Sequence, residues 1–254
     1  MTVLLEARGV TKHFGGVQAL KEVSLTIRQG EIYGLIGPNG AGKTTFFNVL
    51  TGLYPRDGGE ISFGGETLRL ASPHEVAKAG IARTFQNIRL FANMTARENV
   101  MVGRHVRTRA GVVGAVFRDR RTRDEEAALR RRADELLRYV GIEHRADDVA
   151  RHLAYGDQRR LEIARALATD PKLLALDEPA AGMNATETAS LKSLIEGLRA
   201  DGLTVLLIEH DVRLVMGLCD RVAVLDYGEK IAEDVPISVQ RNPKVIEAYL
   251  GGSA

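Results

Sequence analysis

The segment that most constrains the fold of this chain is a glycine-rich loop at residues 37–45, with the sequence GPNGAGKTT. It follows Ile32–Ile36, an apolar run typical of a buried strand, and it leads into a predicted helix at residues 46–53. Glycine lets the backbone turn tightly enough for successive N–H groups to point at phosphate oxygens, at the positive end of the following helix. A glycine-rich turn without a ligand is the alternative, but the order strand, loop, helix favours a phosphate-binding loop.

The same loop predicts which residues bind a nucleoside triphosphate. Four of them, Gly37, Gly42, Lys43 and Thr44, meet the pattern G-x-x-x-x-G-K-[S/T]. Lys43 is expected to reach the β- and γ-phosphates, and the Thr44 hydroxyl is expected to complete the coordination of Mg²⁺. The full set of nucleotide contacts predicted from the loop is Asn39, Gly40, Ala41, Gly42, Lys43, Thr44 and Thr45.

The composition is that of an ordinary soluble globular protein. Of the 254 residues, 44% are hydrophobic and 27% charged, and no apolar run approaches the ~20 residues that span a bilayer. The net charge of +2 is too balanced to favour nucleic acid as a partner. The lone Cys219 excludes an internal disulfide, which fits a cytoplasmic protein, and the six histidines lack zinc-ligand spacing. The N-terminus lacks the basic region and cleavage site of a signal peptide, so none is expected.

The first part of the chain predicts antiparallel strands. Apolar and polar residues alternate around Leu4–Val10 and Ala19–Ile27, with two glycines at 15–16 between them. Glycines at 58–59 and 64–65 then punctuate a second, shorter strand pair.

An arginine-rich, helix-forming region extends from about Ala96 to Val140. Acidic residues are interleaved with its arginines, as near Arg118–Arg123 and Arg130–Arg132, so charge pairs three or four residues apart are expected on helices. Solvated helices are favoured over a polyanion-binding patch, because the acids weaken the attraction for phosphate.

Three apolar runs, Leu173–Leu176, Thr204–Ile208 and Val222–Leu225, predict further strands. A helical stretch separates the first two, as a parallel crossover connection requires. The sequence therefore predicts one α/β nucleotide-binding domain, with a helical insertion between the phosphate loop and the strand that begins at Leu173.

Two adjacent carboxylates, Asp177 and Glu178, end that strand. In α/β sheets, ligands bind at the carboxyl ends of the strands. Asp177 is therefore predicted to hold Mg²⁺ through water, and Glu178 to orient or deprotonate the attacking water. The alternative, an ordinary solvated acidic turn, is less favoured beside a phosphate loop.

Two single residues hold similar positions at the ends of predicted strands. Gln86 follows Ile81–Phe85, and His210 follows Thr204–Glu209. Gln86 is predicted to bind Mg²⁺ and the attacking water while it senses the γ-phosphate, and His210 is predicted to donate to the γ-phosphate. Alone, either residue would be interpreted as structural, but their shared position favours a catalytic role with Lys43 and Glu178.

The combined pattern resembles the ATP-binding cassette (ABC) family of transport ATPases over essentially the whole chain. The deciding segment is LAYGDQRRLEIARAL at residues 153–167, a short distance before Asp177, where that family has its signature segment. The resemblance implies that Ala154, Tyr155 and Gly156 bind the γ-phosphate of an ATP held by a partner subunit, through N–H groups at a helix start. Each chain would supply half of two ATP sites, and Phe14 would stack on adenine.

The resemblance also implies the architecture. The fold class is α/β, with a P-loop NTPase (RecA-like) core, an N-terminal antiparallel β subdomain and an inserted helical subdomain. The whole chain, 1–254, is expected to be one ABC ATPase domain. Its expected parts are the β and core subdomain at about 1–91 and 168–240, the helical subdomain at about 92–167 and a C-terminal tail at about 241–254.

The chain departs from the family's usual Leu-Ser-Gly-Gly-Gln at Ala154, Tyr155 and Asp157. Ala154 lacks a hydroxyl that would donate to the γ-phosphate, and a hydrogen bond to a charged group contributes about 1.5–3 kcal/mol. A second departure is Asn184, where the family commonly has Asp. Both departures bear on how the two sites of a dimer communicate.

These details are most similar to one group, the ATP-binding subunits of branched-chain, or hydrophobic, amino acid importers. The segments that carry the likeness are Arg83–Phe91, Leu153–Leu167, Glu178–Asn184, Ile208–Asp211 and Val245–Gly251. The resemblance implies ATP hydrolysis coupled to transport, with ATP and Mg²⁺ as cofactors.

The same resemblance implies several partners. They are two transmembrane permease subunits, a second ATPase subunit that forms a heterodimer (a homodimer is the alternative) and, indirectly, a periplasmic or lipid-anchored substrate-binding protein. The groove near Gln86–Met94 would hold a cytoplasmic helix of the permease. No nucleic acid is expected, and the chain would be peripheral at the cytoplasmic face of a bacterial or archaeal inner membrane.

Other functions share parts of the pattern. Urea and short-amide importers and the ATPase of lipopolysaccharide export have very similar subunits, so the cargo and the direction of transport stay open. Soluble ABC ATPases of DNA repair or translation usually carry coiled-coil insertions or tandem cassettes, for which 254 residues leave no room. A small-molecule kinase with a P-loop would not explain residues 153–167 together with His210.

Overall fold

The computed structural model describes residues 2–68, 72–104 and 120–250; Met1 and the segments 69–71, 105–119 and 251–254 lie outside the described residues. The chain divides into two compact units, Met1–Arg83 with Lys172–Ala254, and Thr84–Pro171. The second unit is longer at both ends than the predicted helical subdomain at 92–167, and the predicted tail at 241–254 belongs to the first unit.

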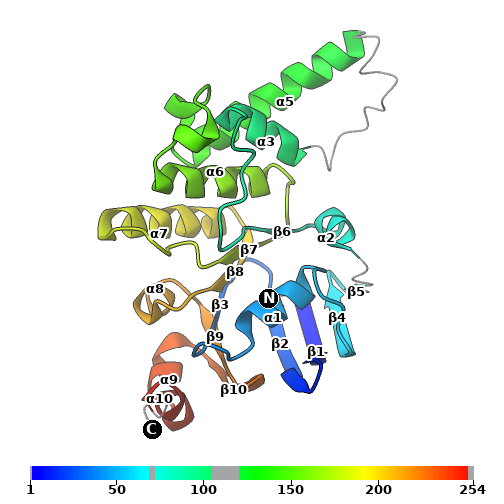
Figure 1. Cartoon of the computed structure of the whole chain (residues 1–254), viewed down its shortest axis with the longest axis vertical. Helices are drawn as coiled ribbons and strands as arrows, with labels where there is room; N and C mark the ends of the chain where they lie inside the picture. The colour runs from blue at the N-terminus through cyan, green and yellow to red at the C-terminus, as the bar shows by residue number, and fades with distance from the viewer. Residues whose placement is uncertain (1, 69–71, 105–119, 251–254) are drawn as a thin grey trace. The chain divides into compact units, whose positions relative to one another are not determined.

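The larger sheet of the first unit has six strands in the order β10-β9-β3-β8-β7-β6 (Figure 1). Its strands are β3 (Ile32–Ile36), β6 (Ile81–Arg83), β7 (Leu173–Asp177), β8 (Thr204–Ile208), β9 (Arg221–Asp226) and β10 (Glu229–Asp234). All pair in parallel except β10, which is antiparallel to β9. Every residue of β3, β7 and β8 is buried, which explains their nearly continuous apolar sequences. The three strands predicted after residue 172 are confirmed.

The smaller sheet is antiparallel, with the order β2-β1-β4-β5. It contains β1 (Val3–Phe14), β2 (Val17–Arg28), β4 (Gly58–Phe63) and β5 (Glu66–Thr67). The two strand pairs predicted from alternation and glycine spacing are therefore confirmed.

Six helices of the first unit are described: α1 (Lys43–Leu50), α2 (Pro73–Ala79), α7 (Ala185–Ala200), α8 (Val212–Met216), α9 (Pro236–Gln240) and α10 (Pro243–Leu250). Helix α7 connects β7 to β8, which is the predicted crossover. The helix predicted at 46–53 is wrong at both ends. It starts earlier because Phe46 N–H already donates to the Gly42 carbonyl at 2.8 Å, and it stops where Gly52 takes a φ of +73°.

One hydrophobic core joins both sheets to α1. Leu5 and Leu25 contribute from the smaller sheet, Leu35 from the larger sheet, and Phe46 and Phe47 from α1. Burial of α1 on this core fixes the loop that precedes it, because the helix cannot shift without exposing two phenylalanines to water.

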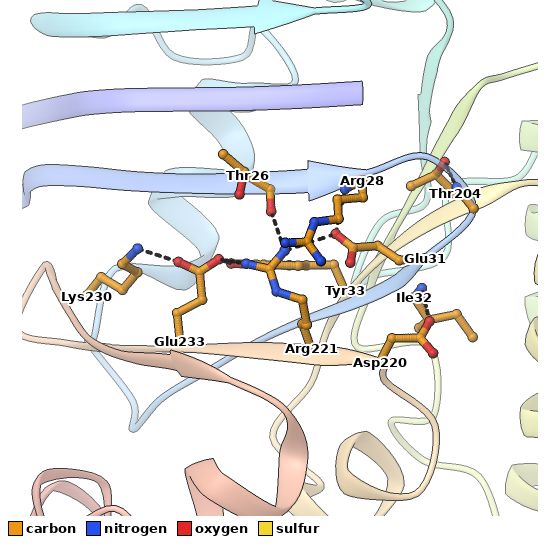
Figure 2. Close-up of polar contacts among 11 residues, drawn as sticks. Thr26, Arg28, Glu31, Ile32, Tyr33, Thr204, Asp220, Arg221, Lys230 and Glu233 are labelled. Atoms are coloured by element: carbon orange, nitrogen blue, oxygen red, sulfur yellow. Dashed lines mark hydrogen bonds and ion pairs between the residues drawn. The ribbon is translucent and has the colours of Figure 1, made fainter. Parts of the chain in front are cut away.

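A partly buried charge cluster also links the two sheets (Figure 2). Arg221 of β9 donates to the Thr26 carbonyl of β2 at 3.1 Å and to Glu31 at 3.4 Å, and it pairs with Glu233 of β10. Glu233 also accepts the Tyr33 hydroxyl at 2.8 Å. Burial raises the pKa of the Glu31 carboxyl, which the Arg28 N–H and the charge of Arg221 oppose. The cluster fastens β2 to β9 and β10.

The second unit is helical. Its described elements are α3 (Ala96–Arg104), α5 (Arg120–Tyr139), α6 (Tyr155–Leu167) and the short 3₁₀ turns η2 (Glu143–Arg145) and η3 (Ala150–His152). Buried Val100, Leu137 and Leu161 come from the described helices α3, α5 and α6, respectively. The expected pairing of interleaved charges occurs between Arg132 and Glu135, at 3.1 Å on the surface of α5. Part of the predicted helical region, 105–119, lies outside the described residues.

Candidate nucleotide-binding site

The phosphate loop connects β3 to α1, in the predicted order. At Gly37 a Cβ atom would lie 2.1 Å from the Leu225 carbonyl oxygen, and at Gly42 it would lie 2.7 Å from that of Ala19. Gly42 also has a φ of +100°, and as the N-cap of α1 it offers no side-chain oxygen to the first helical turn. The loop therefore has the glycine-dependent backbone that a phosphate cradle needs.

The turn between β9 and β10 braces this loop. Gly228 N–H donates to the Ala41 carbonyl at 3.0 Å, and the Gly228 carbonyl accepts Lys21 N–H of β2 at 2.8 Å. A Cβ at Gly228 would approach the Ala19 carbonyl oxygen to 2.8 Å. The sequence gives only one signal for this brace, the glycine in Tyr227-Gly228, which does not by itself predict the contact.

Lys43 is held inside the loop it belongs to. Its ammonium donates to the carbonyls of Gly37 and Pro38 at 2.7 and 3.0 Å, and the residue is 7% exposed. Burial lowers the pKa of Lys43, and the charges of Glu178 and Asp177 oppose that shift. The predicted cation and the two predicted acids of the site are therefore close enough to interact.

Asp177 ends β7 and is almost fully buried. Arg83 at the end of β6 lies 3.7 Å from it and also donates to Asn48 at 3.0 Å and Thr51 at 2.6 Å, next to the end of α1. The Arg83 guanidinium stacks on the Phe47 ring at 4.3 Å. Arg83 thus fixes the carboxylate relative to α1, a role that the sequence analysis did not find.

Glu178 and His210 lie together after neighbouring strands β7 and β8. Nδ1 of His210 is 3.7 Å from the Glu178 carboxylate and 3.6 Å from that of Glu209. Glu178 has a φ of +46°, a conformation that non-glycine residues rarely adopt, and its N–H donates to the Ile208 carbonyl at 2.9 Å.

Glu209 supports this arrangement from below the surface. It is fully buried, and it accepts Ala180 N–H at 2.9 Å and His210 N–H at 3.1 Å. Burial raises the pKa of its carboxyl, against these backbone hydrogen bonds. The predicted strand Thr204–Ile208 is confirmed at both ends, and Glu209, directly after it, uses its side chain to hold the following turn.

Phe14, the predicted adenine contact, lies at the end of β1. It is 44% exposed, its ring packs edge-on against Tyr54 at 5.3 Å, and the Lys12 ammonium lies 5.4 Å from the ring centroid. The exposed Phe14 ring, near the segment that follows α1, is therefore compatible with stacking on adenine. The alternative that Phe14 is a core residue is excluded by its exposure.

A cavity of about 700 Å³ opens beside the phosphate loop. It is lined by residues 38–41 of the loop, by Asp226 and Tyr227 of the β9–β10 turn, by Ile231, and by Lys244, Glu247 and Ala248 of α10. Gly37 N–H donates to the Tyr249 hydroxyl, and burial raises the pKa of Tyr249 to about 12 despite that hydrogen bond. The C-terminal helix therefore packs on its own unit, beside the predicted site.

Gln86 belongs to the second unit. The predicted strand Ile81–Phe85 is too long, since β6 ends at Arg83, and Gln86 lies in the loop that follows. The strand cannot continue because Phe85 N–H donates to the Glu162 carboxylate at 3.2 Å and so is not available to a strand ladder.

The predicted signature segment forms the start of α6. Ala154 is its N-cap and makes no side-chain cap hydrogen bond, Asp157 lies in the first turn, and Tyr155 is 43% exposed. The helix start therefore receives no oxygen from a capping side chain.

Asn184, the second departure, has a clear structural role. It is the N-cap of α7, where its side chain accepts Glu187 N–H at 3.0 Å while the Glu187 carboxylate accepts Asn184 N–H at 2.9 Å. This reciprocal capping box satisfies two backbone donors.

Comparison with known proteins gives the family. The family model described as "ABC transporter" matches residues 20–181, well over half of the chain. This chain belongs to the ABC transporter family. A second model, "Branched-chain amino acid ATP-binding cassette transporter", matches residues 229–254 of this ABC protein.

Two relatives show how the ABC protein compares within its family. It is 45% identical over 98% of both chains to BraF of Pseudomonas aeruginosa, a high-affinity branched-chain amino acid transport ATP-binding protein. It is 36% identical over 97% of both chains to LptB of Escherichia coli, the ATP-binding protein of a lipopolysaccharide export system. The predicted resemblance to ABC ATPases is confirmed.

Solved structures agree with the fold. The ADP conformation of MJ1267, an ATP-binding cassette of an ABC transporter, has a TM-score of 0.86 and 32% identity, covering 99% of this chain and all of that one. A dimeric structure of the ABC cassette MJ0796 has a TM-score of 0.78 and 28% identity, covering 92% and 99%. The predicted P-loop NTPase fold class is confirmed, and as a member of this family the chain has an ATP-binding domain.

Proposed function

We propose that this protein is the ATP-hydrolysing motor subunit of a membrane importer for branched-chain or other hydrophobic amino acids. The observation that carries the proposal is the gathering of Lys43, Asp177, Glu178 and His210 at the phosphate loop in a chain 45% identical to BraF. Its alternatives differ in cargo or direction, and they leave the chemistry of the site unchanged.

Glu178 is the general base of the proposed hydrolysis. Its side chain is 21% exposed, so water reaches a carboxylate that is otherwise fixed by the turn after β7. The carboxylate takes a proton from the attacking water, the water oxygen bonds to the γ-phosphorus, and the bond from that phosphorus to the bridging oxygen of the β-phosphate breaks, so that ADP and phosphate leave. His210 beside it donates to the γ-phosphate, and Lys43 neutralises the β- and γ-phosphates from within the loop.

The residues present also fit a magnesium ion. Among the described residues there is no group of three or more His, Cys, Asp or Glu side chains that would form a protein-only metal site. Mg²⁺ is usually held by one or two protein oxygens plus phosphate oxygens and water. Thr44 at the start of α1 and Asp177 at the end of β7 supply such oxygens. Gln86, in the second unit, is a further contact that the sequence alone predicts. The bound ion would neutralise charge on the β- and γ-phosphates.

A second subunit completes the proposed site. Ala154, Tyr155 and Gly156 at the start of α6 bind the γ-phosphate of an ATP held by a partner ATPase, through backbone N–H groups and the helix dipole. The absence of a side-chain cap on this helix and the dimeric state of the related cassette MJ0796 support the arrangement.

The transporter supplies the other partners. We assign two transmembrane permease subunits, a second ATPase subunit and, indirectly, a substrate-binding protein, and we place the chain at the cytoplasmic face of the membrane. None of the helices within residues 2–68, 72–104 and 120–250 is long and apolar enough to cross a bilayer. The segment 86–94 holds a cytoplasmic helix of the permease, and exposed Phe91 and Met94 give it an apolar surface.

The identity to LptB favours a second candidate, export of a lipid. The identity to BraF is higher, and the branched-chain model matches residues 229–254, which supports import.

Capture of the tagged full-length chain from gently solubilised membranes, followed by mass spectrometry, distinguishes these functions. Two multispanning permeases with a second small ATPase are expected, and uptake of labelled leucine should require the chain. Companions from an envelope lipid pathway would indicate export, and recovery with ribosomes or nucleic acid alone would contradict transport.

A further inference from the structure

Arg159 of α6 is a buried arginine with several hydrogen-bond partners. It is 3% exposed, and its guanidinium donates to the carbonyls of Phe85 and Gln86 at 2.8 and 2.5 Å. The same group donates to the Tyr155 hydroxyl at 2.9 Å and lies 5.3 Å from the centroid of the Tyr155 ring. One side chain thus holds both the loop that contains Gln86 and the first residue of the signature helix.

Glu162, one turn further along α6, completes the contact. It is 1% exposed and accepts Phe85 N–H at 3.2 Å, with Arg89 N–H at 3.5 Å. Arg159 lies 3.4 Å from its other oxygen. Burial raises the pKa of Glu162, and the Phe85 N–H and the charge of Arg159 oppose that shift.

Stability alone does not explain why a charged pair, Arg159 and Glu162, occupies this buried position. Buried ion pairs are often matched or exceeded in stability by apolar side chains of similar volume, because removing two charges from water is costly. Apolar side chains, however, would leave the carbonyls of Phe85 and Gln86 and the N–H of Phe85 without their partners. The pair therefore serves to fix the path of the loop backbone, and it uses the backbone of Gln86 rather than its side chain.

We propose that Arg159 and Glu162 are a positioning pair that locks the Gln86 loop to the signature helix, so that the two ATP sites of a dimer respond to each other. This inference rests on the proposed function, in which Gln86 contacts the chain's own ATP while Tyr155 and Gly156 contact the partner's ATP. When ATP binds at the chain's own site, it fixes the position of Gln86. Because Arg159 and Glu162 join the Gln86 loop to α6, the start of α6 is then fixed as well. The partner's ATP therefore meets a helix start that is already in its binding position.

Two conservative variants test the pair in the full-length chain, assembled with its partner ATPase if one is found. R159K keeps the charge but replaces a planar fork that reaches several acceptors with a single ammonium. E162Q keeps the shape and an oxygen acceptor but removes the charge. The initial rate of hydrolysis is measured as a function of MgATP concentration, and the affinity of each separate chain for a fluorescent ATP analogue is measured in parallel.

We expect a wild-type Hill coefficient above one and at most about two, the number of sites. Both variants should reduce it to about one and lower kcat about tenfold to a hundredfold, as a misplaced contact would. The affinity of the separate chain should change by less than about twofold. E135Q is the matched control, because Arg132 and Glu135 have the same spacing on α5 but are exposed, and its curve should match the wild type.

Unchanged cooperativity in R159K, or a wild-type Hill coefficient of about one, would overturn the inference. Equal losses in analogue affinity and kcat would also overturn it, since they indicate damage to one site rather than lost coupling. Should E162Q fail to fold, R159K alone decides, because it preserves volume and charge. Hydrolysis by the wild type tests the proposed function separately from these comparisons.

Discussion

Helices α1 and α6 differ in how they would meet a phosphate, although both begin without a capping side chain. By contrast, side-chain oxygens of Ser72, Asn184 and Asp211 cap the starts of α2, α7 and α8. α9, a helix of five residues, is likewise uncapped. The two longer uncapped helices are the two that the proposed function places against ATP.

The difference between them lies in the use of their cations. Lys43 at the start of α1 faces back into the phosphate loop, where its ammonium contacts two loop carbonyls. Arg159 in α6 instead donates to the Gln86 carbonyl and to the Tyr155 hydroxyl, while the first turn carries an acid, Asp157. In the proposed function, the first helix combines backbone donors with a cation that binds phosphate, and the second relies on its backbone donors alone. Binding through backbone donors does not require the hydroxyl that Ala154 lacks.

Glu178→Gln should have the largest effect, in the chain's own half of the site. Removing the base should lower kcat about 10²- to 10⁴-fold, the usual contribution of a general base. ATP binding should persist, and the variant should accumulate as a closed dimer on gel filtration with MgATP. Glu196→Gln, an exposed acid on α7, is the control for the loss of a negative charge. Wild-type turnover in Glu178→Gln would remove Glu178 from the mechanism.

Lys43→Ala should come next, with a loss of ATP affinity of about a hundredfold. In the proposed site, the ammonium donates charge-assisted hydrogen bonds to phosphate, each worth about 1.5–3 kcal/mol. Without it, the negative charges of Asp177 and Glu178 repel the phosphates without the charge of Lys43 to offset them. Calorimetric titration measures the change, and Lys192→Ala on the surface of α7 should leave the affinity unaltered. Equal affinity in both variants would contradict the binding role of the first helix start.

Ala154→Ser should have a smaller effect, of opposite sign, in the half of the site that is donated to the partner. The hydroxyl restores a donor to the γ-phosphate and strengthens ATP-dependent dimerisation by up to about tenfold. The comparison is made by gel filtration or light scattering in the Glu178→Gln background, so that hydrolysis does not dissolve the dimer. No gain would mean that the new hydroxyl caps its own helix instead, and that backbone donors alone bind the phosphate.

How much was predictable follows from what each feature depends on. The strands at 173–176 and 204–208, the phosphate loop and the pairing of Asp177 with Glu178 depend on local sequence, and residue pattern was sufficient to find them. Arg83, Arg159 and Glu162 act on residues 32 to 94 positions away in the sequence, as Arg83 does on Thr51 and Asp177, and no local pattern marks them. The helix at 46–53 was misplaced because glycine geometry, not apolar periodicity, determined where α1 begins and ends.

Asn184→Ala should have the smallest effect, and it sharpens the comparison from the capped side. Losing an N-cap costs about 1 kcal/mol of stability, because Glu187 N–H loses the side-chain oxygen that accepts it. Urea unfolding measures this loss, and Asn184→Asp should restore it because aspartate caps equally well. Stability, and not ATP affinity, should change, since the proposed function places ATP at the starts of α1 and α6 and not at the start of α7. A loss of ATP affinity in Asn184→Ala with unaltered stability would show that a capped helix start also contributes to nucleotide binding. The absence of a capping side chain would then no longer distinguish the helices that bind ATP from the others.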